Sequence, residues 1–153
     1  YEEKWMKMMR DKLGLFGSDH KDKFLILDLL TWMHEKKVDY TNTFCNLMDL
    51  APKKNNLFDD NGFVNWKKRW VDRLSKNNSS SKKYLEIMKK NNPLVIPRNH
   101  KVEEALEAAE KNDLKPITQL LEILKDPYTQ KEDTPNYQIP SRSDEKYQTF
   151  CGT

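Results

Sequence analysis

Glycine, cysteine and long apolar runs are all scarce in this chain. Its 153 residues include four glycines, which are Gly14, Gly17, Gly62 and Gly152. A phosphate-cradling loop of the Walker or dinucleotide type needs closely spaced glycines at a strand-to-helix turn, so we expect the chain to bind no nucleotide by itself. The two cysteines, Cys45 and Cys151, are too few for a disulfide framework, which favours a reducing, cytoplasmic compartment.

The chain also lacks the marks of a membrane protein, an exported protein or a metal site. No run approaches the roughly 18 apolar residues of a spanning helix, so we expect no membrane partner. Tyr1–Trp5 shows no signal peptide, and since Tyr1 is not a methionine we interpret the chain as part of a longer protein. The histidines, His20, His34 and His100, lie far apart without metal-ligand spacing, so we predict no metal ligand.

Charged residues are plentiful but nearly balanced in sign. The 27 basic and 24 acidic residues give a net charge of +3 and an isoelectric point near 8.7, which is a weak argument for nucleic acid. Acidic clusters such as Glu103, Glu104 and Glu107 fit a solvated helix surface, because an acid–base pair needs an apolar pocket that separates the two pKa values. We therefore predict no catalytic residue in this chain.

Apolar residues recur with helical period as far as about Lys125, and the alternating pattern of a half-buried strand is missing. The sequence predicts an all-α fold with about six or seven helices in one compact domain over residues 1–125. From Asp126 the sequence is aperiodic and carries Pro127, Pro135 and Pro140. Residues 126–153 are therefore predicted to form an irregular C-terminal arm that bears Cys151.

The first two predicted helices differ in how their apolar residues are distributed. The first has a single apolar stripe and ends at Gly14; the stripe consists of Trp5, Met8, Met9 and Leu13. The second, capped by Ser18 or Asp19, runs to about Lys36. Its apolar residues between 24 and 33 surround the helical wheel, so it needs cover on most sides, from this domain or from a part of the protein absent here.

Two further helices are predicted from capping residues. Asp39 or Thr41 caps a short helix on which Cys45 points inward as a small buried hydrophobe. Ser79 or Ser80 caps another helix that runs to about residue 88.

A strong amphipathic stripe lies between these two helices. Its apolar side consists of Phe63, Trp66, Trp70, Val71 and Leu74, and its basic side of Lys67, Lys68, Arg69 and Arg73. Aromatic residues interleaved with basic ones are typical of single-stranded nucleic-acid binding, where bases stack on rings. The same spacing is typical of a core-facing helix with a solvated basic face, and we favour this second interpretation.

Two prolines, Pro93 and Pro97, predict an extended segment between residues 91 and 100. Asn99 or His100 begins the next helix, and Asp113 with Pro116 opens the last one. Both helices repeat apolar residues at the i, i+3, i+4 and i+7 positions: Val102, Ala105, Leu106 and Ala109, then Ile117, Leu120, Leu121 and Leu124. A short connection predicts an antiparallel pair.

Several segments resemble the C-terminal part of the selenoprotein O family, the pseudokinases also known as protein adenylyltransferases. The most specific are Asn92–His100 and the near-terminal Tyr147–Cys151. The other segments that carry the resemblance are Trp5–Leu15, Asp39–Thr41 with Phe44, Glu103–Ala109 and Asp126–Tyr128. The resemblance covers essentially the whole chain.

The resemblance implies that the chain is the C-terminal helical part of a larger enzyme. Such an enzyme binds ATP with Mg²⁺ or Mn²⁺ in a kinase-like fold and transfers AMP to hydroxyl side chains of proteins. The family's nucleotide- and metal-binding residues lie N-terminal to this region, so we expect the chain to be inactive by itself. Its expected partners are the N-terminal kinase-like part of the same protein and the protein substrates of the whole enzyme.

Cys151 is the one functional residue that the sequence suggests. A thiol near the end of an arm is a candidate for disulfide exchange, although an idle terminus is the alternative. The resemblance implies a redox role, a disulfide to a cysteine of the catalytic domain, with Gly152–Thr153 in place of the more usual two serines. Pairing with Cys45 is the rival. Arg98 could hold phosphate, but an ion pair with a carboxylate is the simpler interpretation.

Two hypotheses from different classes follow. In the first, the chain supports the catalytic core of a protein adenylyltransferase, presents an apolar docking surface around residues 24–33, and carries a redox-sensitive arm. In the second, it is a stand-alone helical interaction module that binds partners such as nucleic acid. Salt-dependent oligonucleotide binding that depends on Trp66 and Lys67 would distinguish the second from the first.

Overall fold

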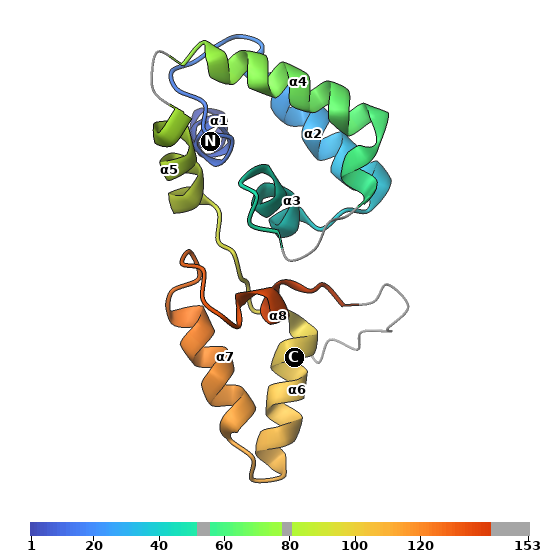
Figure 1. Cartoon of the computed structure of the whole chain (residues 1–153), viewed down its shortest axis with the longest axis vertical. Helices are drawn as coiled ribbons and strands as arrows, with labels where there is room; N and C mark the ends of the chain where they lie inside the picture. The colour runs from blue at the N-terminus through green and yellow to red at the C-terminus, as the bar shows by residue number, and fades with distance from the viewer. Residues whose placement is uncertain (52–55, 78–80, 142–153) are drawn as a thin grey trace.

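The protein is described here from a computed structural model that covers residues 1–51, 56–77 and 81–141 (Figure 1). Within these ranges the elements are α1 (Glu2–Lys12), α2 (Asp22–Lys36), α3 (Tyr40–Leu47), the 3-10 helix η1 (Asn56–Asp59), α4 (Asn61–Ser75), α5 (Ser81–Asn91), α6 (Asn99–Glu110), α7 (Lys115–Lys125) and α8 (Thr134–Gln138). No strand occurs among these residues, and the all-α prediction is confirmed. None of these helices has the length and apolar character required to cross a lipid bilayer.

The buried apolar side chains form two clusters, whereas the sequence predicted one compact body. The larger lies among α1 to α5, which we call the five-helix unit, and the smaller lies among α6 to α8, which we call the hairpin unit. Figure 1 shows them as the upper and lower halves of the molecule. Leu94 belongs to the larger cluster and the next residue, Val95, to the smaller. Consecutive residues of the chain therefore join the two cores.

The start of α2 differs from the prediction. Gly14 and Gly17 adopt positive φ angles of 69° and 67° and end the first helical segment as expected. Neither Ser18 nor Asp19 caps α2, which begins at Asp22 behind Lys21. The Asp19 carboxylate instead accepts a hydrogen bond from the Lys21 amide (2.8 Å), because it closes a tight turn just before the helix.

The amphipathic helix α4 confirms the predicted core stripe with two exceptions. Trp66 and Trp70 are buried, and their indole groups donate hydrogen bonds to the carbonyl oxygens of Leu25 (2.7 Å) and Leu13 (2.9 Å). These rings are therefore unavailable as a stacking platform. Val71, expected inside, is half exposed; Arg73, expected on the solvated face, is buried. Arg73 is turned inward because a buried carboxylate on α2 requires it, as described below.

The hairpin unit also departs from the prediction in part. The helices α6 and α7 lie side by side and run in opposite directions, as expected (Figure 1). Leu120 and Ile123 supply the buried apolar side chains of α7, whereas Leu121, expected inside, is exposed. The arm predicted to be irregular contains the short helix α8, which sequence periodicity could not reveal because it has only five residues.

Candidate functional site

Cys151, the predicted redox residue, lies outside the described residues, but the arm that leads to it is described as far as Ser141. The last residue of α8, Gln138, is 1% exposed and anchors this arm to the five-helix unit. Its side-chain amide donates hydrogen bonds to the carbonyl oxygen of Leu50 (3.1 Å) and to the sulfur of Cys45 (3.7 Å). The side-chain amide of Asn42 donates in turn to the backbone carbonyl oxygen of Gln138 (2.9 Å).

The preceding residues pack α8 against the rest of the hairpin unit. Tyr137 packs against the smaller apolar cluster, and Thr134 is buried, with its hydroxyl accepting a hydrogen bond from the Lys131 amide (2.7 Å). Adjacent residues of one short helix thus contact both units. The arm therefore leaves the molecule from a fixed position.

Cys45 points inward as predicted and is completely buried. Burial raises the pKa of its thiol to about 11, against a smaller opposing effect of the hydrogen bond from Gln138. The group is therefore a neutral thiol at physiological pH, and only the thiolate attacks disulfides. Pairing with Cys151 would require Gln138 to leave its position over the sulfur.

Arg98 forms a bidentate ion pair with Asp39, the interpretation preferred from sequence. Its guanidinium donates to the two carboxylate oxygens at 2.8 and 3.1 Å, and Asp39 also caps α3 by accepting from the Asn42 amide (2.8 Å). Burial by itself would raise the pKa of Asp39, but the hydrogen bonds from Arg98 and Asn42 outweigh it and lower the pKa. The pair joins α3 to the start of α6 and is not free to hold phosphate.

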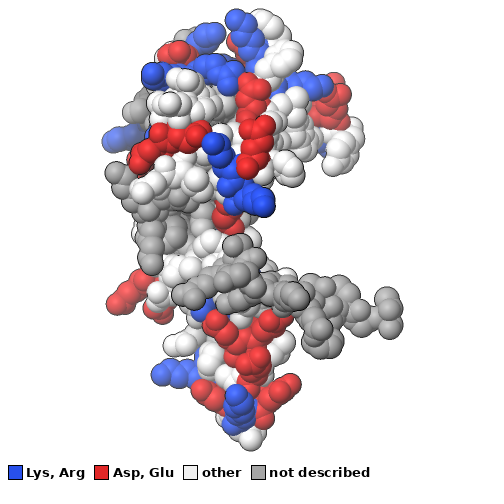
Figure 2. Space-filling model, turned by 90° about the vertical axis from the view of Figure 1, so that its right-hand side faces the viewer, with Lys and Arg blue, Asp and Glu red and all other residues white. Residues whose placement is uncertain are grey.

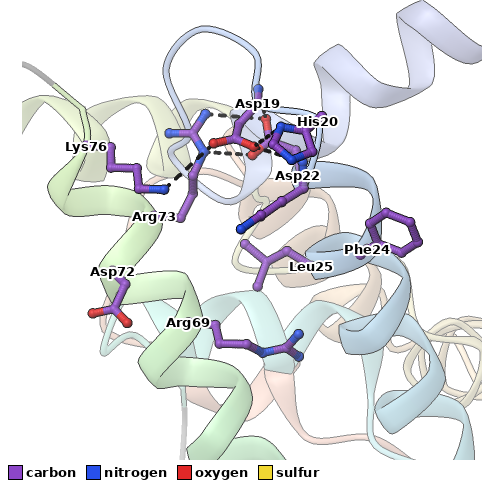
Figure 3. Close-up of a pocket in the computed structure, with 10 residues that line it drawn as sticks. Asp19, His20, Asp22, Phe24, Leu25, Arg69, Asp72, Arg73 and Lys76 are labelled. Atoms are coloured by element: carbon purple, nitrogen blue, oxygen red, sulfur yellow. Dashed lines mark hydrogen bonds and ion pairs between the residues drawn. The ribbon is translucent and has the colours of Figure 1, made fainter.

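A half-open cavity of about 580 Å³ lies between α2 and α4 (Figure 3). At one end of the cavity lies Asp22, whose carboxylate is fully buried. It accepts hydrogen bonds from Arg73 (2.7 Å), from Arg10 (2.7 Å) and from the Asp19 amide (3.0 Å). Burial would raise the pKa of Asp22, but these donors outweigh that effect and lower it. Asp22 therefore stays ionised and connects α1, α2 and α4.

Further charged side chains around this cavity are also paired. Arg69 forms an ion pair with Asp28 (2.8 Å), and Lys76 approaches Asp19 (3.8 Å). Phe24 forms part of the wall and is 65% exposed. Within the described ranges, no three His, Cys, Asp or Glu side chains are grouped so that they could hold a metal ion. The cavity thus presents an exposed ring beside a satisfied charge cluster, which suits contact with another surface better than chemistry.

Sequence reasoning missed the buried polar residues of this region. Neither Asp22 nor Asn77 stands out in the sequence as a buried position. Asn77 is in fact buried: it accepts from the Phe16 amide (3.0 Å) and donates to the Gly14 carbonyl oxygen (2.8 Å). One partly buried and one buried arginine around a buried aspartate give no periodic signal, because Arg10 and Arg73 lie 12 and 51 residues from Asp22 in sequence.

Comparison with known proteins places this fold in a family. Residues 1–125 match the family described as protein adenylyltransferase SelO. The chain is 50% identical over 154 residues to the protein nucleotidyltransferase YdiU of Pelagibacter ubique, and 46% identical over 155 residues to that of Alcanivorax borkumensis. The Bacillus thuringiensis relative is 44% identical over 155 residues. Each comparison covers the whole of this chain but only 32% of the relative, so the chain spans about a third of the curated relatives' length. The chain belongs to the SelO family of protein adenylyltransferases.

Proposed function

We propose that the chain is the C-terminal helical part of a protein adenylyltransferase, that it supports a kinase-like catalytic core, and that its arm carries a redox-regulatory thiol at Cys151. The observation that carries this proposal is the match of the entire chain to about a third of relatives that are themselves named protein nucleotidyltransferases. The whole enzyme transfers AMP from ATP, with Mg²⁺ or Mn²⁺, to Ser, Thr or Tyr hydroxyl groups of proteins. The nucleotide and the metal bind outside this chain.

The exposed side of α2 supports the scaffold role. Phe24 and Leu27 are 65% and 42% exposed and lie three residues apart, so they share one face of the helix. The opposite side of α2 is buried in the larger core. We therefore expect α2 to be covered on one side by its own domain and on the other side by a neighbouring domain. The catalytic core is the proposed neighbour, in the cytoplasm.

The anchorage of α8 supports the redox role. Cys151 lies 13 positions after Gln138 in the sequence, and a fully extended chain of that length spans at most about 45 Å. The partner thiol therefore lies within about 45 Å of Gln138. Oxidised glutathione can accept the two electrons of the reaction: both thiols lose their protons, one sulfur–sulfur bond forms, and two reduced glutathione molecules leave.

The test compares AMP transfer by the full-length protein and its Cys151→Ser variant in oxidised glutathione and in dithiothreitol. For each protein we take the ratio of the AMP-transfer rate in oxidised glutathione to the rate in dithiothreitol. We expect this ratio to differ from one in the unchanged protein and to equal one in Cys151→Ser. Cys45→Ala is the matched control, because its buried sulfur should leave the ratio unaltered. Identical ratios in all three proteins would remove the redox role, and absence of AMP transfer would remove the enzymatic proposal.

The alternative of a nucleic-acid module receives no support from the tryptophans, since both are buried. A titration of the chain with a fluorescent single-stranded oligonucleotide at two salt concentrations decides the matter. Binding that weakens with salt and is lost in Lys67→Glu would favour the alternative over the scaffold.

A further inference from the structure

The hairpin unit has one side covered and one side bare. Glu104 of α6 and Gln119 of α7 line the groove that faces α8. Leu106 and Leu121 each lie two residues further along their helices, which corresponds to a rotation of about 200°. These two leucines therefore point to the side away from α8. Val102, Leu114, Ile117 and Leu124 belong to the same side by helical spacing. We call these six residues the hairpin face.

The hairpin face is apolar and open. Leu106, Leu114 and Leu121 are 50%, 62% and 56% exposed. Val102, Ile117 and Leu124 are only partly buried, packed against the edge of the smaller cluster. Single exposed apolar residues are common on protein surfaces, but a contiguous patch over two paired helices marks an interaction site.

Acidic side chains border the hairpin face on its α6 side. Glu103 and Glu110 lie one turn before and one turn after Leu106 on α6, and neither forms an ion pair within the described part of the chain. Figure 2 shows acidic residues gathered over the lower part of the molecule, where α6 lies. A partner with an apolar stripe bordered by Lys or Arg therefore matches both the leucines and the carboxylates.

We infer that the hairpin face is covered, in the complete protein, by an amphipathic segment with a basic border from the two thirds of the polypeptide that this chain does not include. This inference rests on the proposed function. The relatives are about three times as long as this chain, so most of the polypeptide is available to supply the segment. A second copy is the less suitable occupant, because α6 packed against α6 across a two-fold axis would bring like-charged carboxylates together.

Thiol labelling in the full-length protein tests the inference. Leu121→Cys places a thiol on the hairpin face, and Glu107→Cys places one on the outer side of α6, about 200° from the buried Ala105. Each rate of maleimide labelling is read from the mass of the labelled peptide and divided by its rate in denaturant. We expect Leu121→Cys to react at least about tenfold more slowly than Glu107→Cys. Unchanged circular dichroism and melting temperature show that both variants fold.

Three outcomes decide the inference. Equal normalised rates would overturn it, since the face would be bare. Protection that disappears on dilution, together with a dimer in light scattering, would assign the face to a second copy and also overturn it. Protection independent of concentration, relaxed severalfold by Glu110→Lys and not by Lys111→Glu, supports a basic border. Labelling does not depend on catalysis, so AMP transfer by the same preparations tests the proposed function separately.

Discussion

The five-helix unit and the hairpin unit are built from the same kind of amphipathic helix but differ greatly in what they bury. Among the described residues, the larger core contains eighteen buried side chains and the smaller core contains four, so most of the hydrophobic stabilisation lies in the five-helix unit. Small cores rarely stabilise a fold unaided. The hairpin unit therefore depends on its connections to its neighbour and, we infer, on a segment outside this chain.

Those connections are largely polar. Arg98 reaches Asp39, Gln138 reaches Leu50, and the Leu94 amide donates to the Pro127 carbonyl oxygen (2.7 Å). Two buried polar atoms at this junction, Arg98 Nε and Asn42 Oδ1, have no hydrogen-bond partner in the described part of the chain. Each buried polar atom without a partner costs free energy. The junction between the units is therefore less stable than its hydrogen bonds and ion pair alone would suggest.

The largest expected effect comes from equal truncations in the two cores. Leu29→Ala, at a fully buried position of the five-helix unit, should lower the free energy of unfolding by about 4 kcal/mol. Leu120→Ala should cost about 2 kcal/mol, because the hairpin unit can relax toward solvent. Urea denaturation of the chain measures both values. Equal costs, or a larger cost for Leu120→Ala, would contradict the difference between the cores.

The second effect concerns the charge cluster around Asp22 in the five-helix unit. Asp22→Ala leaves Arg10 and Arg73 without their buried partner and should destabilise the protein by about 3 kcal/mol. Asp28→Ala is the matched control on the same helix, since its ion pair with Arg69 is half exposed and contributes less than about 1 kcal/mol. Similar melting temperatures for the two variants would show that the buried Asp22 cluster contributes no more to stability than the half-exposed ion pair of Asp28.

A smaller effect should follow from loosening α8. Gln138→Ala removes the donor to Leu50 and Cys45, so amide hydrogens of α8 should exchange about tenfold faster, which corresponds to about 1.4 kcal/mol. Alkylation of Cys45 by iodoacetamide should accelerate as well, because its sulfur is uncovered. Glu107→Ala, at an exposed position on the outer side of α6, is the control. Unchanged exchange in α8 would mean that the arm is held by other contacts.

The smallest effect is the response of the junction to acid. The pKa of Asp39 is lowered in the folded protein from its usual 3.8, so its ion pair stabilises the fold above that pH and is lost as the pH falls through the folded pKa. Between pH 6 and pH 3, the free energy of unfolding should fall by about 1 kcal/mol less in Asp39→Asn than in the unchanged chain. Chemical denaturation at the two pH values measures this, and parallel losses would exclude Asp39 as a contributor.

Patterns local in sequence predicted the structure well. Glycine at positive φ ended the first helix, Asp39 capped α3, and the periodic stripe placed Trp66 and Trp70 inside. Each of these depends on residues within two turns of one another. The predicted boundary between residues 1–125 and the arm stays a prediction, as does the role of Cys151.

Features that depend on distant residues escaped the sequence. Arg73 was assigned to the solvated face because no residue near it in sequence reveals its partner Asp22. Leu121 was assigned to the core because it belongs to the same i, i+3, i+4, i+7 pattern as Leu120. The anchor residue Gln138 meets Cys45, 93 positions earlier in the chain, and a lone polar residue in a proline-containing segment carries no signal of burial. Capping and periodicity report on one helix at a time, whereas these contacts arise between helices.

The single peptide bond between Leu94 and Val95 has a mechanical consequence. Neighbouring side chains enter different cores, so no spacer residue separates the two bodies at this point. Inserting a residue between them would displace Leu94 or Val95 from its core, whereas exposed loops tolerate insertions better. The spacing of the two bodies along the chain is therefore set at this one bond.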